Sequence, residues 1–138
     1  MFVKEEYRSL NSKQRENYNF HQLAAVLADY GYNSLRLSND WQGADFIACH
    51  INGVSFLKIQ LKGRLTVAKR YRNKDIHVAF PLGKDWYVFD HDAFLNFAEQ
   101  NLKVTEESKR WREAGERRWG KPPKWALEFL DQYRVQCS

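Results

Sequence analysis

Cysteine is scarce in this sequence of 138 residues, which contains only Cys49 and Cys137. The pair matches no zinc-ligand spacing and cannot provide the disulfide framework of a small secreted domain. No apolar run approaches the roughly 20 residues that span a bilayer, and the opening MFVKEEYRSL lacks the apolar core of a signal peptide. We therefore expect a cytoplasmic protein without a membrane partner.

Proline and glycine are also sparse, with three and seven residues, and no repeat or low-complexity linker divides the chain. A chain of this length builds one hydrophobic core. We expect a single domain over residues 1–138, with a core at about 14–90 and a C-terminal helical extension at about 91–138.

Acidic residues are outnumbered by basic ones, 17 against 22, which gives a formal net charge of +5. A basic balance favours polyanionic partners, because binding to phosphates releases counterions. Aromatic residues make up 15% of the chain. They stack on bases as well as packing in cores, and core packing is the commoner use.

Hydrophobic spacing predicts a helix, a group of strands and then more helices. Apolar residues recur at intervals of three and four from Tyr18 to Tyr30, which predicts an amphipathic helix that Ser12 caps and Gly31 ends. Strand patterns cover 33–37, 44–50, 54–61, 76–80 and 86–89, with a loop at 38–43. Asn52-Gly53 is a strong hairpin signal. Helical patterns return at 91–101, 106–118 and 123–134.

This order predicts an α+β fold, similar to an α/β/α arrangement. We expect a central mixed sheet of about five strands, an N-terminal helix and C-terminal helices.

Three polar residues are predicted to meet at the open end of the hairpin. Gln60 and Lys62 point to the same side of one strand because side chains alternate along it. Asp45 begins the preceding strand, so antiparallel pairing across Asn52-Gly53 brings it opposite residues 60–62. We predict that Asp45, Gln60 and Lys62 form a catalytic site.

These residue types suit phosphodiester hydrolysis with a divalent metal. Asp45, the Gln60 side-chain oxygen and the Leu61 backbone carbonyl are hard oxygen donors of the kind that Mg²⁺ prefers. A bound ion acidifies water and offsets charge on the phosphate. Lys62 is placed to orient the attacking water or to stabilise developing charge.

The motif Asp45…Gln60-x-Lys62 resembles the signature of the PD-(D/E)XK nuclease superfamily. The strand LKIQLKGR is similar to the QxK variant of some homing endonucleases and Holliday junction resolvase relatives, and the segment ADYGYNSLRL resembles their first helix and strand. The likeness covers roughly residues 14–90. It implies a restriction-endonuclease-like domain that cleaves DNA with Mg²⁺ or Mn²⁺.

The sequence departs from that pattern in two ways. Gln60 replaces the usual Asp or Glu, which removes a negative charge from the metal site. The first helix lacks an acid at the family's position. Glu16 lies one turn earlier and is a further catalytic candidate, with a surface or capping acid as the alternative interpretation. Asp40 is another acid nearby, with an ordinary loop acid as the alternative interpretation. These departures keep a catalytically inactive DNA- or RNA-binding subunit as an alternative function.

Basic residues near this motif are the candidates for contacting nucleic acid. A solvated charged face is the alternative interpretation. The candidates are Arg64, Lys69, Arg70 and Arg72, followed by Arg117 and Arg118 between Trp111 and Trp119. We expect DNA as the partner, with RNA left open and a homodimer as an arrangement typical of nucleases that cut both strands. A third hypothesis is an interaction protein whose basic tail docks on an acidic partner.

Overall fold

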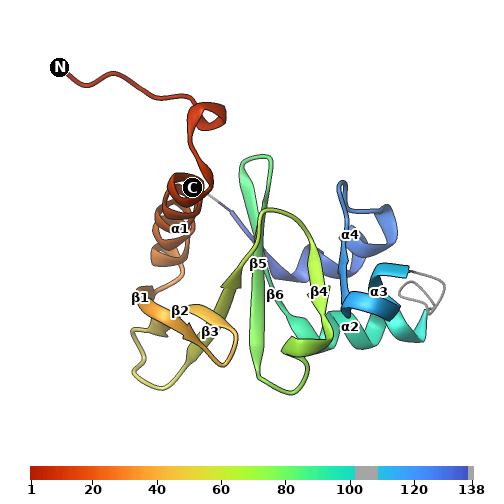
Figure 1. Cartoon of the computed structure of the whole chain (residues 1–138). Helices are drawn as coiled ribbons and strands as arrows, with labels where there is room; N and C mark the ends of the chain where they lie inside the picture. The colour runs from red at the N-terminus through yellow and green to blue at the C-terminus, as the bar shows by residue number, and fades with distance from the viewer. Residues whose placement is uncertain (102–108, 137–138) are drawn as a thin grey trace.

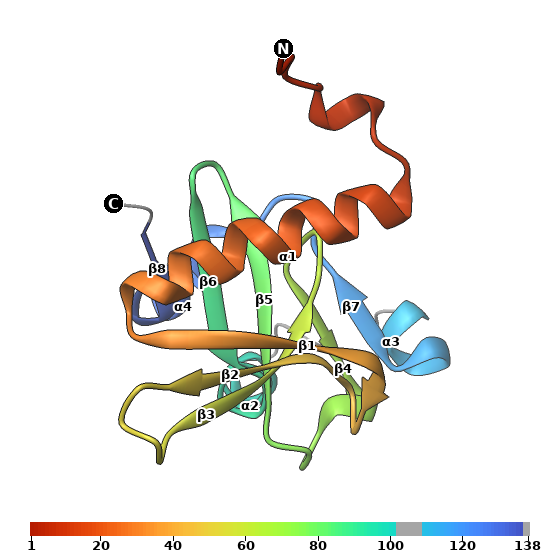
Figure 2. The same cartoon turned by 90° about the vertical axis from the view of Figure 1, so that its left-hand side faces the viewer.

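A computed structural model describes residues 1–101 and 109–136. It contains a six-stranded mixed sheet with a helix on one face and a small second sheet and shorter helices on the other (Figures 1 and 2). The predicted α+β class is confirmed, and the main sheet has one strand more than the expected five. None of the described helices is long and apolar enough to cross a membrane.

The long helix α1 (Ser12–Asp29) follows a short 3-10 turn η1 (Tyr7–Ser9). Asn11, and not Ser12, caps it: the Asn11 side chain accepts from the Gln14 backbone N–H, and the Gln14 side chain accepts from Asn11, both at 2.9 Å. This reciprocal pair satisfies two backbone donors that the helix start would leave open. The buried face of α1 covers the sheet through Phe20, Leu23, Val26 and Leu27.

The main sheet has the order β1-β2-β3-β5-β6-β8. Its strands are β1 (Tyr32–Trp41), β2 (Ala44–His50), β3 (Phe56–Leu61), β5 (Ile76–Leu82), β6 (Asp85–Asp90) and β8 (Arg134–Val135). β3 and β5 run parallel, and every other neighbouring pair is antiparallel. Phe46 pairs with Ile59 across the predicted hairpin, which sets Asp45 level with Gln60.

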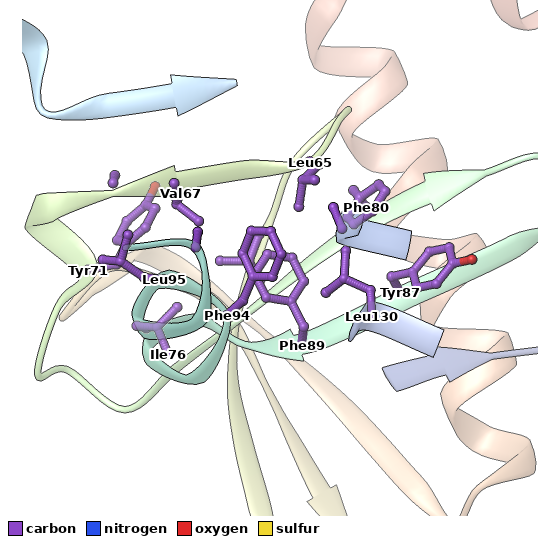
Figure 3. Packing of buried hydrophobic residues seen from close by; sticks show 14 of the residues in the cluster. Leu65, Val67, Tyr71, Ile76, Phe80, Tyr87, Phe89, Phe94, Leu95 and Leu130 are labelled. Atoms are coloured by element: carbon purple, nitrogen blue, oxygen red, sulfur yellow. The ribbon is translucent and has the colours of Figure 1, made fainter. Parts of the chain in front are cut away.

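The second face of the sheet is covered by elements that the sequence pattern only partly predicts. These are β4 (Thr66–Ala68), the 3-10 turn η2 (Lys69–Tyr71), α2 (His91–Gln100), α3 (Lys109–Ala114), β7 (Glu116–Arg118), α4 (Lys124–Leu130) and the 3-10 turn η3 (Asp131–Tyr133). Figure 3 shows Leu65 and Val67 packed opposite Phe94 and Phe89 in the core between these layers.

Two helical predictions in this region are corrected. The helix expected at 106–118 is described only over Lys109–Ala114, since residues 102–108 lie outside the described part. It ends at Gly115, which has φ +65° and favours a helix end. Residues 116–118 are instead a strand, because they pair with β4. The helix expected to reach residue 134 ends at Leu130 and continues as η3.

A tight turn joins β1 to β2, where the sequence predicted a loop at 38–43. Trp41 pairs with Ala44, so Gln42 and Gly43 alone make the connection, with φ of +51° and +88°. Two consecutive positive φ values are typical of the hairpin turn that matches strand twist. A Cβ on Gly43 would also lie 3.3 Å from the Tyr71 ring.

Gly43→Ala should therefore destabilise the protein by more than the roughly 1–2 kcal/mol of left-handed strain alone. Gly53 also has positive φ (+73°) but open space around it, and Gly63 is open without positive φ. Urea denaturation should rank the loss of stability as Gly43→Ala, then Gly53→Ala, with Gly63→Ala near neutral. Equal losses at positions 43 and 53 would show that the Tyr71 contact is unimportant.

Candidate active site

Asp45 lies where β2 begins and β3 ends. Its Oδ2 accepts a hydrogen bond from the Leu61 backbone N–H at 2.8 Å. The bond joins residues 16 positions apart and holds the carboxylate against the end of β3. The hairpin thus brings Asp45 beside residues 60–62.

Burial and neighbouring acids raise the pKa of Asp45 from its ordinary 3.8 to about 6. Loss of hydration on burial is the largest cause, and the Leu61 N–H opposes it because it stabilises the charged form. A side-chain hydrogen bond with Asp40 and the charges of Asp40 and Glu16 raise the pKa further. Three acids therefore influence one another here.

Asp40 contacts Asp45 because β1 continues to Trp41 and turns immediately into β2. Asp40 therefore lies in a strand and not in the loop that the sequence predicted. Two carboxyl groups in hydrogen-bonding contact need a shared proton or a cation to offset their repulsion. The signal available in the sequence was Gln42-Gly43, whose short turn brings the residues before it across from Asp45.

Gln60 is buried, with 7% of its surface exposed, in the strand position level with Asp45. Lys62 follows it on the same side of the chain, and its Nζ lies 5.8 Å from the centre of the Tyr71 ring. The Lys62 backbone N–H donates to the Ala79 carbonyl at 2.8 Å, which fixes this residue against β5. A cation over an aromatic face is attracted by the ring electrons.

Glu16 lies on the first turns of α1 and forms an ion pair with Arg36 at 3.2 Å. Together with Leu61, Lys62 and Gly63 it lines a pocket of about 340 Å³. This places the candidate helix acid on the wall facing the end of β3, while its charge is partly offset by Arg36.

The donor set fits a hard divalent cation. Within residues 1–101 and 109–136, no three His, Cys, Asp or Glu side chains are grouped to hold a metal ion. The oxygen donors nearby are instead two carboxylates in contact, the Gln60 amide and the Leu61 carbonyl. Mg²⁺ takes one or two carboxylates and keeps several waters, so this set is sufficient in kind.

Most of the basic candidates are engaged in surface contacts. Arg70 pairs with Glu116 at 3.4 Å, and Arg72 pairs with Glu99 at 2.7 Å. Lys69 lies over Trp111 and Arg117 over Trp119, with 5.0 and 5.1 Å to the ring centres. Arg64 and Arg118 are exposed, and Arg118 pairs in the strand with Thr66, two residues from Arg64.

The fold is similar to a known nuclease structure. The chain matches the structure of a bacterial homing endonuclease, I-Ssp6803I, with a TM-score of 0.51 and 16% sequence identity, over 90% of this chain and 86% of that one. This likeness shows that the two chains share a fold. The sequence matches no protein-family model and no curated protein.

Substituting Asp45 by Asn should change how stability depends on pH. A carboxyl whose folded pKa is raised destabilises the fold as it ionises, so wild-type stability in EDTA should fall as pH rises from about 4 to about 6. Asp45→Asn keeps an acceptor for the Leu61 N–H but removes the ionisation. The free energy of unfolding of Asp45→Asn, measured by urea denaturation, should therefore exceed that of wild type by more at pH 7.5 than at pH 4.5.

Asp131→Asn is the control, since the Asp131 side chain is 70% exposed. It should shift stability little between the two pH values. If the difference in free energy of unfolding between Asp45→Asn and wild type is the same at pH 4.5 and 7.5, the raised pKa of Asp45 is contradicted.

Proposed function

We propose that the protein is a divalent-metal-dependent DNA endonuclease of the PD-(D/E)XK type, with Asp45, Gln60 and Lys62 at its active site. The single observation that carries the proposal is the Asp45 carboxylate, bonded to the end of β3 and in contact with Asp40. Asp45 is half-buried beside an exposed acid that repels it, which is costly for stability, and perturbed acids of this kind cluster at functional sites. The likeness to a homing endonuclease fold supports the same class.

In this proposal Asp45, Asp40, the Gln60 side-chain oxygen and the Leu61 carbonyl hold Mg²⁺ or Mn²⁺. When bound, the ion supplies an acidified water and positive charge beside the phosphate. Asp45 needs to be ionised for this role, and a cation near it favours the ionised form. The Leu61 N–H fixes one carboxylate oxygen of Asp45 and so restricts how the group can turn.

Lys62 has the role of a positively charged partner for the scissile phosphate or the attacking water. Its backbone is fixed by Ala79 and its ammonium group lies over Tyr71. A pre-positioned cation stabilises the charge that develops on phosphate oxygens without reorganising during the reaction. Exposed Arg64 and Arg118 are the candidates for binding the DNA backbone beyond the cleavage point.

A second function, DNA binding without cleavage, is favoured by the small number of charged ligands at the site. Gln60 contributes no charge, and no cluster of three ligating His, Cys, Asp or Glu side chains exists within the described ranges. Such a protein would bind DNA independently of metal and of Asp45. Its affinity would still fall steeply with salt, because phosphate contacts release counterions.

Asp45→Ala and Lys62→Ala should each reduce cleavage of supercoiled and branched DNA by at least about 100-fold, since each removes electrostatic stabilisation of the transition state. The assay compares Mg²⁺ or Mn²⁺ with EDTA. Asp131→Ala and Lys74→Ala are the matched controls and should cleave like wild type. If the wild-type protein does not cleave DNA, and Asp45→Ala keeps salt-sensitive DNA binding, the results would support a DNA-binding protein without cleavage.

Gln60→Glu should strengthen metal binding by restoring a negative oxygen donor level with Asp45. In the absence of metal the added charge should lower stability, because it repels Asp45 in a half-buried site. Calorimetric titration with Mn²⁺ should show tighter binding, and thermal unfolding should show a larger rise in Tm on adding Mn²⁺. Unchanged affinity would place Gln60 outside the metal site.

A further inference from the structure

Two adjoining hollows form one groove beside the candidate site. The pocket of about 340 Å³ at Leu61 and Lys62 shares Tyr7, Asn19 and Gly63 with a second pocket of about 500 Å³. The second pocket extends along α1 to the turn between β5 and β6, where Lys84 lies. Figures 1 and 2 both show this turn projecting beside α1.

The wall of the groove carries two tyrosine rings in its middle. Tyr7 and Tyr18 are 44% and 46% exposed, and their ring centres are 5.5 Å apart. The Tyr7 hydroxyl accepts a hydrogen bond from Asn19 Nδ2 at 2.9 Å, and the Arg15 guanidinium lies 5.2 Å from the Tyr7 ring centre. Two large rings are thus held in fixed positions at the surface without being buried.

Amide side chains accompany these rings. Asn19 and Gln22 line the same pocket, together with Trp86. Aromatic faces stack on nucleobases, and side-chain amides offer both donors and acceptors to base edges. The wall therefore presents the two kinds of contact that an unpaired base can use.

Positive charge dominates both ends of the groove. Arg15 and Lys62 line one end and Lys84 lines the other. Glu16 is the acid that lines it, and that carboxylate is paired with Arg36. A basic channel with an aromatic floor complements a single strand of nucleic acid, whose phosphates and base faces are both accessible.

We propose that this groove binds a single-stranded segment of DNA, with an unpaired base stacked on Tyr18 beside Tyr7 and flanking phosphates near Lys84 and Lys62. This proposal rests on the proposed nuclease function, which makes the bound DNA a substrate. The bases of a continuous duplex are stacked on one another and cannot offer their faces to the tyrosines. The substrate is therefore DNA with an unpaired strand, such as a flap or fork, presented to the end of β3.

The test measures binding in EDTA, so that it does not depend on cleavage. The probe is a single-stranded oligonucleotide that carries 2-aminopurine, whose fluorescence is quenched when the base stacks on an aromatic ring. Its affinity is compared with that of a duplex of the same sequence at the same salt concentration. Wild-type protein should quench the probe and bind the single strand more tightly than the duplex.

Tyr18→Ala should weaken single-strand binding by about 10-fold and reduce the quenching, because stacking on one base is lost. Tyr18→Phe keeps the ring and should behave like wild type. Tyr30→Ala is the matched control, because Tyr30 ends the same helix and is 45% exposed but lines a different pocket. Thermal unfolding of each variant checks that the fold is retained.

The outcomes separate this proposal from the proposed function. The single-strand proposal is overturned if single strand and duplex bind equally well, or if quenching is unchanged in Tyr18→Ala. Either result would count against it even where metal-dependent cleavage is found. If the single strand binds in a Tyr18-dependent way but no DNA is cleaved, the single-strand proposal is supported and the nuclease proposal fails.

Discussion

The hydrogen bond from the Leu61 N–H to Asp45 Oδ2 is the constraint around which the candidate site is arranged. It forms where β3 leaves its antiparallel partner, so a backbone donor that the ladder does not use is satisfied by a carboxylate. An unpaired buried N–H is costly, and pairing it with an ion gives one of the stronger hydrogen bonds in proteins. The same contact fixes the acid, orders the end of β3 and sets where Lys62 emerges.

Stability and chemistry oppose each other at this point. Burial and the contact with Asp40 make the charged form of Asp45 unfavourable, while the Leu61 N–H favours it. The rest of the fold compensates through its two apolar cores, one beneath α1 and one beneath α2 and the small sheet. Replacing one of the two acids would relieve their repulsion, and a cation bound between them would offset it.

The sequence predicted the strands around the site because residues close together in the chain determine their turn and their pairing. The turn at Asn52-Gly53 alone fixes the register of β2 and β3, and Phe46 does pair with Ile59 as that register requires. β4 and β7 were not predicted. Val67 lies among basic residues, and residues 116–118 favour a helix locally, so each becomes a strand only through pairing with the other. The place of Asp40 in a strand beside Asp45 was not predicted, because the turn that aligns them has a non-glycine residue, Gln42, at positive φ.

The closing contacts of the sheet bring together segments from opposite ends of the described chain. The Gln136 backbone N–H donates to the Tyr30 hydroxyl at 3.0 Å across 106 positions, and β8 pairs only with β6. Contacts of such sequence separation form late, because a long loop must close before they contribute. During synthesis, α1 and the first three strands emerge well before residues 134–136 complete the sheet edge. The emerging chain therefore carries an open strand edge at β6 from the synthesis of Asp90 until that of residues 134–135, and aggregation during this interval is the hazard that this topology brings.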